Sequence, residues 1–298
     1  MSFKQVTIIG TGLIGGSLGL ALKKRQLAGR IIGCDRAPVL KRAKYCGAIE
    51  AGTANPAEAV RGSDLVVLAT PVIPILELIA RLGPALPAKT LVTDVGSTKA
   101  QIVQSAAKSF GRNAGQRFLA GHPMAGKENA GVEFAEADLF EGAVWLFTPL
   151  PGQNVHAGQC GQFIRCAEKM GASIAILDPS DHDRFCAWIS HLPQMISTAL
   201  AAALVDEFGP EAPLLDIGGR ALREMTRISG SPYSMWRDIA ITNRKNLSDA
   251  LDRLGQRLAH IRESLDSREL EAEFERAHQL KKNPPQRRGE KSGDRIIG

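Results

Sequence analysis

The feature that most constrains this chain is a glycine-rich turn between an apolar run and a helical pattern near its start. Gly10-Thr11-Gly12-Leu13-Ile14-Gly15 follows directly on the apolar run 6–9 and leads into a stretch of leucines at helical spacing. The first glycine permits the tight turn, the second lets a phosphate approach the backbone, and the third lets helix and strand pack closely. A second apolar run, 31–34, ends at Asp35, about 20 residues further on, where a ribose-binding acid belongs. The pattern predicts a dinucleotide site formed by residues 10–15 and Asp35.

Two neighbouring features refine the choice of cofactor. Asp35 would accept hydrogen bonds from both ribose hydroxyls of NAD and repel the 2′-phosphate of NADP, whereas the guanidinium of Arg36 could pair with that phosphate. NAD is therefore the prediction, and NADP stays open. Thr70 and Pro71 follow the apolar run 65–69. We predict that they cover the adenosine and pyrophosphate, although an ordinary strand-end turn explains them nearly as well.

The two halves of the chain have different patterns. Seven short apolar runs predict buried parallel strands joined by helices, at 6–9, 31–34, 65–69, 91–94, 118–120, 144–147 and 173–177. From residue 181 onward the periodicity is helical, with breaks at Gly-Pro, Gly-Gly and Gly-Ser-Pro sequences. The fold class expected is an α/β Rossmann-type domain over residues 1–178, followed by an all-α domain over residues 179–282 and a disordered basic tail over residues 283–298.

One helix of the second half is expected to run from about residue 180 to Phe208. Pro193 lies inside it and should kink it or leave a carbonyl without its partner. Its alanine-rich part, 198–205, is apolar nearly all round, which is typical of a helix buried between helices or between subunits. This favours a homodimer that forms through the helical domain.

Composition excludes several classes of protein. Of 298 residues, 44% are hydrophobic and 23% charged, an ordinary globular balance. Much of the basicity behind the net charge of +6 lies in the segment 281–295, which has no aromatic residue for stacking, so we expect no nucleic-acid partner. We find neither a signal peptide nor an apolar run of about 20 residues, and so expect a cytoplasmic protein without a membrane span. Five cysteines without a C-x-x-C pair, and no histidine at zinc-ligand spacing, predict neither disulfides nor a metal site.

Two further strand ends belong to the edge of the sheet where ligands bind. They are the loops 94–99 and 121–128, and the second contains His122 among small residues. A histidine at such an edge can reach a nicotinamide, and a base of near-neutral pKa is what removal of an alcohol proton during hydride transfer requires. Taken alone, His122 could equally be a structural loop histidine.

The wider sequence around His122 resembles one enzyme family. The stretch GHPMAG-x-E at 121–128, preceded by DVGSTK at 94–99, resembles the prephenate/arogenate dehydrogenases. The resemblance extends from about residue 5 to 280 and continues in the helical half at 181–183, 190–193, 226–228 and 235–239. It implies NAD-dependent oxidation and decarboxylation of prephenate to 4-hydroxyphenylpyruvate in tyrosine biosynthesis. Arogenate, the alternative substrate, would give tyrosine by the same chemistry.

The resemblance also implies roles for individual residues. His122 would deprotonate the substrate hydroxyl, and Ser97 would hydrogen-bond that hydroxyl or His122. Ser97 could also cap a helix beginning at Thr98, and the two roles can coexist. Arg227 would bind a substrate carboxylate through two parallel hydrogen bonds, unless it forms a surface ion pair. Trp236 would pack against the substrate, or in the core.

Two residues are candidates for contacts to the substrate side chain. Glu128, in the catalytic loop, is a candidate acid, and Gln194 stands where the family commonly has a second histidine. A neutral amide can serve the keto group of prephenate as readily as the ammonium of arogenate, so we predict that prephenate is used efficiently. His182 and His191 are expected to be structural residues at the domain junction.

Two other functions fit parts of the pattern. A dehydrogenase of small β-hydroxy acids has a similar domain order but usually relies on a lysine base in the helical domain. A non-catalytic NAD-sensing regulator could use the same fold. Formation of an aromatic product together with NADH would exclude the β-hydroxy acid dehydrogenase. Turnover of any substrate would exclude the non-catalytic regulator.

Overall fold

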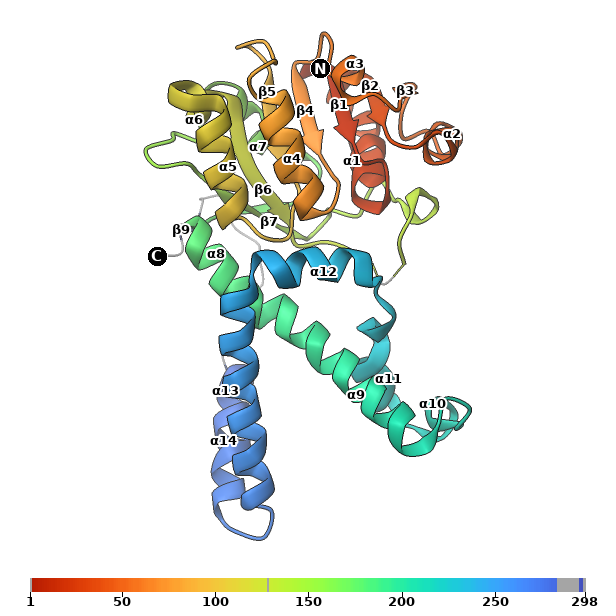
Figure 1. Cartoon of the computed structure of the whole chain (residues 1–298), viewed down its shortest axis with the longest axis vertical. Helices are drawn as coiled ribbons and strands as arrows, with labels where there is room; N and C mark the ends of the chain where they lie inside the picture. Colours follow the sequence, from red (N-terminus) through yellow and green to blue (C-terminus); the bar gives the residue numbers. More distant parts are fainter. Residues whose placement is uncertain (1, 128, 283–294, 297–298) are drawn as a thin grey trace.

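The computed structural model describes residues 2–127, 129–282 and 295–296. A twisted sheet with helices on both faces forms the upper part of the molecule, and two helical extensions project from it (Figure 1). The first half of the chain forms the sheet part, and the extensions come from the second half. The observed fold agrees with the predicted α/β domain followed by a helical one.

The sheet contains all seven predicted strands and two more. In chain order the strands are β1 (Phe3–Ile9), β2 (Ala28–Cys34), β3 (Ala51–Thr53), β4 (Leu65–Leu68), β5 (Leu91–Asp94), β6 (Phe118–Pro123), β7 (Val144–Thr148), β8 (Ser173–Ile176) and β9 (Arg295–Ile296). Their spatial order is β3-β2-β1-β4-β5-β6-β7-β8-β9. The first six reproduce the order 3-2-1-4-5-6 of dinucleotide-binding sheets.

The prediction of an entirely parallel sheet is wrong at one strand. β7 pairs antiparallel with β6, with Gly121 opposite Phe147, while the other neighbouring strands run parallel. The connection from β6 to β7 contains only the short turn η2 (Val132–Phe134) and no crossover helix. The chain therefore re-enters the sheet at the edge where β6 ended, which requires the opposite direction.

Helices cover both faces of the sheet. They are α1 (Leu13–Lys24), α2 (Ala37–Tyr45), α3 (Pro56–Ala59), α4 (Val72–Leu82), α5 (Ala100–Phe110), α6 (Ala114–Arg117) and α7 (Gly158–Lys169), with the 3-10 turn η1 (Gly111–Asn113) between α5 and α6. Leu18 and Phe163, from α1 and α7, belong to one buried apolar cluster. Ile75 and Ile102, from α4 and α5, belong to a second. These two clusters hold the strand ends in fixed positions.

From residue 179 to residue 282 the chain contains only helices and the turns between them. Its elements are α8 (Pro179–Cys186), the π-helical turn η3 (Ala187–His191), α9 (Leu192–Phe208), α10 (Leu214–Ile217), α11 (Arg220–Thr226), the 3-10 turn η4 (Arg227–Gly230), α12 (Tyr233–Thr242), α13 (Arg244–Glu263) and α14 (Glu269–Lys282). The π-helical turn lies immediately before Pro193, where a helix was predicted to be irregular.

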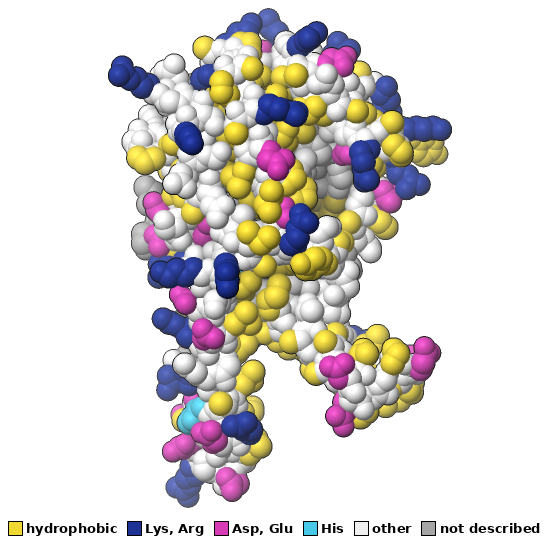
Figure 2. Space-filling view, in the orientation of Figure 1, with side chains coloured by type: hydrophobic (Ala, Val, Ile, Leu, Met, Phe, Trp, Pro, Cys, Tyr) yellow, Lys and Arg dark blue, Asp and Glu magenta, His cyan; other side chains and the backbone are white. Residues whose placement is uncertain are grey.

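Helix α9 is poorly covered within a single chain. Its buried side chains are Leu192, Gln194 and Ser197, whereas Val205 and Phe208 are 47% and 57% exposed. Apolar side chains are visible on both helical extensions (Figure 2). By length and composition alone, Pro179–Phe208 could cross a membrane, a criterion that helices of globular proteins also meet. The alanine-rich part 198–205, which was predicted to be buried, is thus largely exposed within this chain.

The predicted disordered tail, 283–298, lies outside the described residues except for the two residues of β9. Those two residues extend the sheet by pairing in parallel with β8, Arg295 opposite Ala175 and Ile296 opposite Ile176.

Candidate active site

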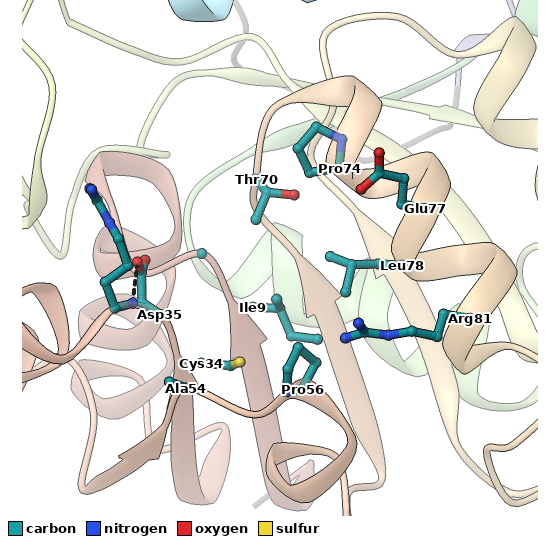
Figure 3. A pocket seen from close by; sticks show the side chains of 12 residues that line it. Ile9, Cys34, Asp35, Ala54, Pro56, Thr70, Pro74, Glu77, Leu78 and Arg81 are labelled. Carbon is teal, nitrogen blue, oxygen red and sulfur yellow. Dashed lines mark hydrogen bonds between the residues drawn. The ribbon is translucent and has the colours of Figure 1, made fainter.

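A cavity of about 350 Å³ lies at the carboxyl ends of β1, β2 and β4. Its lining includes Gly10, Asp35, Arg36, Thr70 and Arg81. Asp35 follows β2 while Arg81 reaches the cavity from α4 on the opposite side (Figure 3). This is the point where the strand order reverses, and ligands of open α/β sheets bind there.

The glycine-rich turn has the geometry of a phosphate-binding turn. Gly10 has a φ of +94°, and a Cβ atom there would lie 2.4 Å from the carbonyl oxygen of Ala69. A Cβ on Gly15 would lie 1.9 Å from the carbonyl oxygen of Gly10, so neither position admits a side chain. At Gly12 a Cβ would meet nothing within 4 Å. Gly12 thus leaves open space over the start of α1, whose amide groups can receive a phosphate.

Asp35 stabilises this turn through hydrogen bonds and also lines the cavity. Its Oδ2 accepts hydrogen bonds from the backbone N–H of Thr11 at 2.8 Å and from the Thr11 hydroxyl at 3.3 Å. Arg36 lines the same cavity, so NADP stays open as an alternative cofactor. Thr70 is half-buried in the lining, Pro71 is exposed at the start of α4, and Leu13 and Ile14 are half-buried at the start of α1.

The edge of β6 carries a buried histidine pair. His122 is 8% exposed, and its Nδ1 lies 3.0 Å from Nε2 of His182 on α8. The Nδ1 of His182 lies 2.9 Å from the Oδ1 of Asp183. Because an ionised carboxylate only accepts hydrogen bonds, His182 carries its proton on Nδ1 and accepts at Nε2. His122 then donates from Nδ1, which assigns its lone pair to Nε2.

The surroundings keep both imidazoles neutral. Burial is the main cause that lowers the pKa of His122 well below its ordinary value, and the charge of Lys99 adds to it. Burial also lowers the pKa of His182, against the opposing effect of Asp183. A neutral His122 with an unprotonated Nε2 is in the state that a general base needs at neutral pH.

A buried ion pair lies at the loops 94–99 and 121–128. Lys99 donates to Asp94, and both side chains are fully buried. Asp94 also accepts hydrogen bonds from the backbone N–H groups of Gly96 and Gly121, at 2.8 and 3.2 Å. One carboxylate thereby ties the loop after β5 to the residue before His122. Burial raises the pKa of Asp94 and lowers that of Lys99, and each opposes the shift of the other.

Asp183 joins the helical half to the nucleotide-binding half. It accepts from the backbone N–H groups of Lys99 and Ala100, at 2.6 and 3.0 Å, and so caps α5 from another element. The predicted cap by Ser97 on a helix beginning at Thr98 is wrong, because α5 begins at Ala100 and its donors are satisfied by Asp183. The alternative Ser97–His122 bond is not among the hydrogen bonds of the described residues.

Gln194 and Arg227 belong to a second group, on α9 and η4. The side-chain amide of Gln194 donates to the backbone carbonyl of Ile228 at 2.8 Å and to the hydroxyl of Thr198 at 3.2 Å. Gln194 therefore holds the turn on which Arg227 lies exposed. No hydrogen bond between described residues joins this group to His122, and Glu128 lies outside those residues.

Trp236 packs edge-on against His191, with ring centroids 6.0 Å apart. Its indole N–H is buried without a hydrogen-bond partner among the described residues. His191 contacts Asn243 at 3.2 Å through its Nδ1, in keeping with the structural role expected for it. Trp236 thus belongs to the junction between η3 and α12.

The sequence interpretation expected His182 at the domain junction as a structural residue and did not foresee that it contacts the candidate base directly. Asp183, Lys99 and Cys186 were not singled out either. A signal was present in Asp181-His182-Asp183 at the start of a helix that follows a strand. His182 and Cys186 are also four residues apart, a spacing that places them on one helical face.

Both halves of the chain match models of known domains. Residues 18–176 match the nucleotide-binding domain of prephenate dehydrogenase, and residues 178–280 match its dimerization domain. The prephenate dehydrogenase of Bacillus subtilis is 31% identical over 273 residues, which cover 90% of this chain and 72% of that protein.

Solved structures agree with the sequence relatives. The prephenate dehydrogenase of A. aeolicus, in complex with hydroxyphenyl propionate and NAD+, is 32% identical and superposes with a TM-score of 0.81, over 95% of this chain and 96% of that one. The arogenate dehydrogenase of Synechocystis is 27% identical with a TM-score of 0.72, over 93% and 97% of the two chains.

Proposed function

The chain belongs to the prephenate dehydrogenase family, and from that premise we propose that it catalyses the NAD-dependent oxidative decarboxylation of prephenate. The products are 4-hydroxyphenylpyruvate, CO₂ and NADH. The observation that carries the proposal is the buried, neutral His122, whose Nε2 is left as the acceptor by the chain of hydrogen bonds through His182 to Asp183.

The cofactor site fits NAD. Gly10 and Gly15 exclude side chains from the turn, Gly12 leaves the start of α1 open, and Asp35 lies at the ribose side of the cavity. Bound there, NAD supplies the hydride acceptor. We propose that residues 10–15, Asp35 and Thr70 hold it, with Pro71 shaping the entrance to α4.

The residues of the chain supply the proton acceptor and hold it in its orientation. His122 takes the proton of the ring hydroxyl on Nε2 as the carbinol is oxidised, and loss of the C1 carboxylate then restores an aromatic ring. His182 fixes the orientation and tautomer of His122, and Asp183 fixes those of His182, as the carboxylate of a catalytic triad does for its histidine. The positive charge that develops on His122 is stabilised by this carboxylate.

The helical half supplies the substrate contacts. Arg227 binds a substrate carboxylate, and Gln194 positions the turn that carries it through the bond to Ile228. Ser97, half-buried between β5 and α5, is proposed to hydrogen-bond the substrate hydroxyl. Glu128 and Trp236 complete the proposed site at the side-chain end of the substrate.

We propose that the protein is a cytoplasmic homodimer. The match to a dimerization domain and the exposed apolar surface of α9 support a two-fold contact between helical domains. In this arrangement residues 1–178 form the nucleotide-binding domain and residues 179–282 the substrate and dimerisation domain.

Arogenate is the second candidate substrate. It is favoured by the resemblance to the arogenate dehydrogenase of Synechocystis, at nearly the same coverage as the prephenate enzyme. The two substrates differ only where a keto group replaces an ammonium. Gln194 carries no charge to discriminate between them, so we expect prephenate to be used at least as well.

The test is a steady-state assay with prephenate, arogenate and a small β-hydroxy acid, each with NAD. We expect NADH and an aromatic product to appear together with prephenate, and no turnover of the hydroxy acid. An arogenate preference above about 100-fold, equivalent to some 2.7 kcal/mol, would overturn the prephenate assignment. Tight NAD binding without turnover of any of the three would support a regulator instead.

A further inference from the structure

Three potential metal ligands converge beside the catalytic base. The Nδ1 of His122, the Nε2 of His182 and the Sγ of Cys186 all lie within 4.8 Å of one another, and all three side chains are buried. His122 comes from β6, and the other two occupy successive turns of one face of α8. The sequence interpretation expected no metal site, because it considered histidine pairs and cysteine pairs but not a mixed pair four residues apart.

The separations are close to those around a tetrahedral ion. The two nitrogens are 3.0 Å apart, and the sulfur lies 3.5 Å from His182 and 4.0 Å from His122. With Zn–N bonds of about 2.0–2.1 Å and Zn–S bonds of about 2.3 Å, a tetrahedron requires about 3.4 Å between nitrogens and about 3.6 Å between nitrogen and sulfur. Shifts of about half an ångström would bring the three atoms into range, leaving a fourth position open.

The surroundings also suit a metal ion. The second nitrogen of His182 is hydrogen-bonded to Asp183, the arrangement by which carboxylates orient metal-binding imidazoles and raise their basicity. The nearby cation, Lys99, is paired with Asp94. His122 is the one member of the cluster with solvent exposure, 8%, whereas His182 and Cys186 are fully buried. An ion would therefore enter past His122.

We propose that His122, His182 and Cys186 form an inhibitory site for a zinc-like divalent cation. Binding at Nδ1 of His122 displaces the proton held there. A neutral imidazole with a metal on Nδ1 carries its proton on Nε2, so the atom that accepts the substrate proton becomes a donor. Burial and the charge of Asp183 raise the pKa of the free Cys186 thiol to about 12, so this side chain becomes a thiolate only as the ion binds and its proton is lost to solvent. The bound ion thus inactivates the base without occupying the cofactor cavity.

The inhibitory part of this inference rests on the proposed function, whereas the binding part does not. Binding is therefore measured directly, by titrating the metal-free full-length protein with Co²⁺ and following thiolate-to-cobalt charge-transfer absorbance. Inhibition is measured separately, by titrating Zn²⁺ into the prephenate assay and adding a chelator afterwards.

Two cysteine variants separate this site from other thiols. Cys186→Ser keeps the volume of the side chain but removes the thiolate, and we expect it to abolish the absorbance band. Zn²⁺ inhibition should weaken at least about tenfold, since even the loss of an outer-shell partner costs about 10- to 100-fold in affinity. Turnover without metal is measured for each variant, so that Zn²⁺ inhibition is expressed relative to that variant's own metal-free rate. Cys46→Ser, which alters a partly exposed thiol after α2, should leave both titrations as in the wild type.

Each outcome has a distinct meaning. A cobalt band that is absent from the wild type, or that persists in Cys186→Ser, overturns the metal site. Zn²⁺ inhibition that is equally strong in the wild type and in Cys186→Ser overturns the inhibitory role. If the protein binds cobalt through Cys186 but turns over neither prephenate nor arogenate, the metal site stands and the proposed function fails.

Discussion

Acidification should destabilise this fold through three buried histidines at the junction of its halves. His122, His182 and His191 all have pKa values lowered mainly by burial, that of His191 to about 4. In the unfolded chain an imidazole takes up a proton below about pH 6.5, while the folded protein keeps it neutral. The folded state therefore binds fewer protons, and stability falls as the pH falls below about 6.5.

The size of the effect follows from linkage. Between pH 7.5 and 5.5, one histidine that stays neutral when folded costs a little over 1 kcal/mol of unfolding free energy, so three cost up to about 4 kcal/mol. For His191 the loss continues down to about pH 4, where the folded form is protonated too. The combined loss of up to about 4 kcal/mol is a large part of the free energy of unfolding of a typical protein, about 5–15 kcal/mol.

Urea unfolding at the two pH values, at one fixed protein concentration, measures the difference. His191→Asn removes one of the three groups and should reduce the pH-dependent loss by a little over 1 kcal/mol. His278→Asn is the matched control, because that side chain lies exposed on α14 and meets water in both states. The reasoning would be refuted if His191→Asn left the pH-dependent loss of unfolding free energy unchanged. It would also be refuted if His278→Asn reduced that loss by the same amount.

Three further predictions concern catalysis and one concerns assembly. His122→Asn should lower kcat by about 10²- to 10⁴-fold with little change in KM, whereas Arg227→Ala should mainly raise KM for prephenate; exchanged phenotypes would reverse the proposed roles. Asp183→Asn should also lower kcat by about 10²- to 10⁴-fold, through the wrong tautomer of His122, without raising KM for NAD. With Asp35 at the ribose, kcat/KM should favour NAD over NADP by at least about tenfold, and equal values would show that Arg36 dominates. Light scattering at micromolar concentration should give a dimer, and a monomer would contradict the role proposed for α9.

The fold was largely predictable because its signals are local. Each buried strand is a run of apolar residues, and the turn at Gly10 carries its own conformational requirement, visible as a positive φ. The direction of β7 was not predictable in this way, since it depends on the path of the connection from β6. The three-residue strand β3 gives too short an apolar run to be recognised.

The site was predictable only where its residues lie near each other in the chain. His122 could be placed at a strand end from its own neighbours. Its contact with His182 joins residues 60 positions apart, and the cap from Asp183 to Ala100 joins residues 83 apart. Such contacts depend on how α8 docks against the sheet. No periodicity encodes that orientation, so Ser97 was assigned a capping role that a distant carboxylate performs.

The long-range contacts also restrict how the enzyme can move. Asp183 binds the start of α5, Asp238 accepts from the backbone N–H of Ile73 at 3.0 Å, and the hydroxyls of Thr98 and Thr242 are 2.8 Å apart. Three hydrogen-bonded contacts thus clamp the helical half to the segments that follow β4 and β5, at the starts of α4 and α5. A hinge that opened here would separate His122 from His182 and remove the control of its tautomer. We therefore expect admission of substrate to rely on movements away from this clamp. The turn that carries Arg227 lies on the helical half and is bonded to α9 through Gln194 and Ile228, so its movement would leave the base intact.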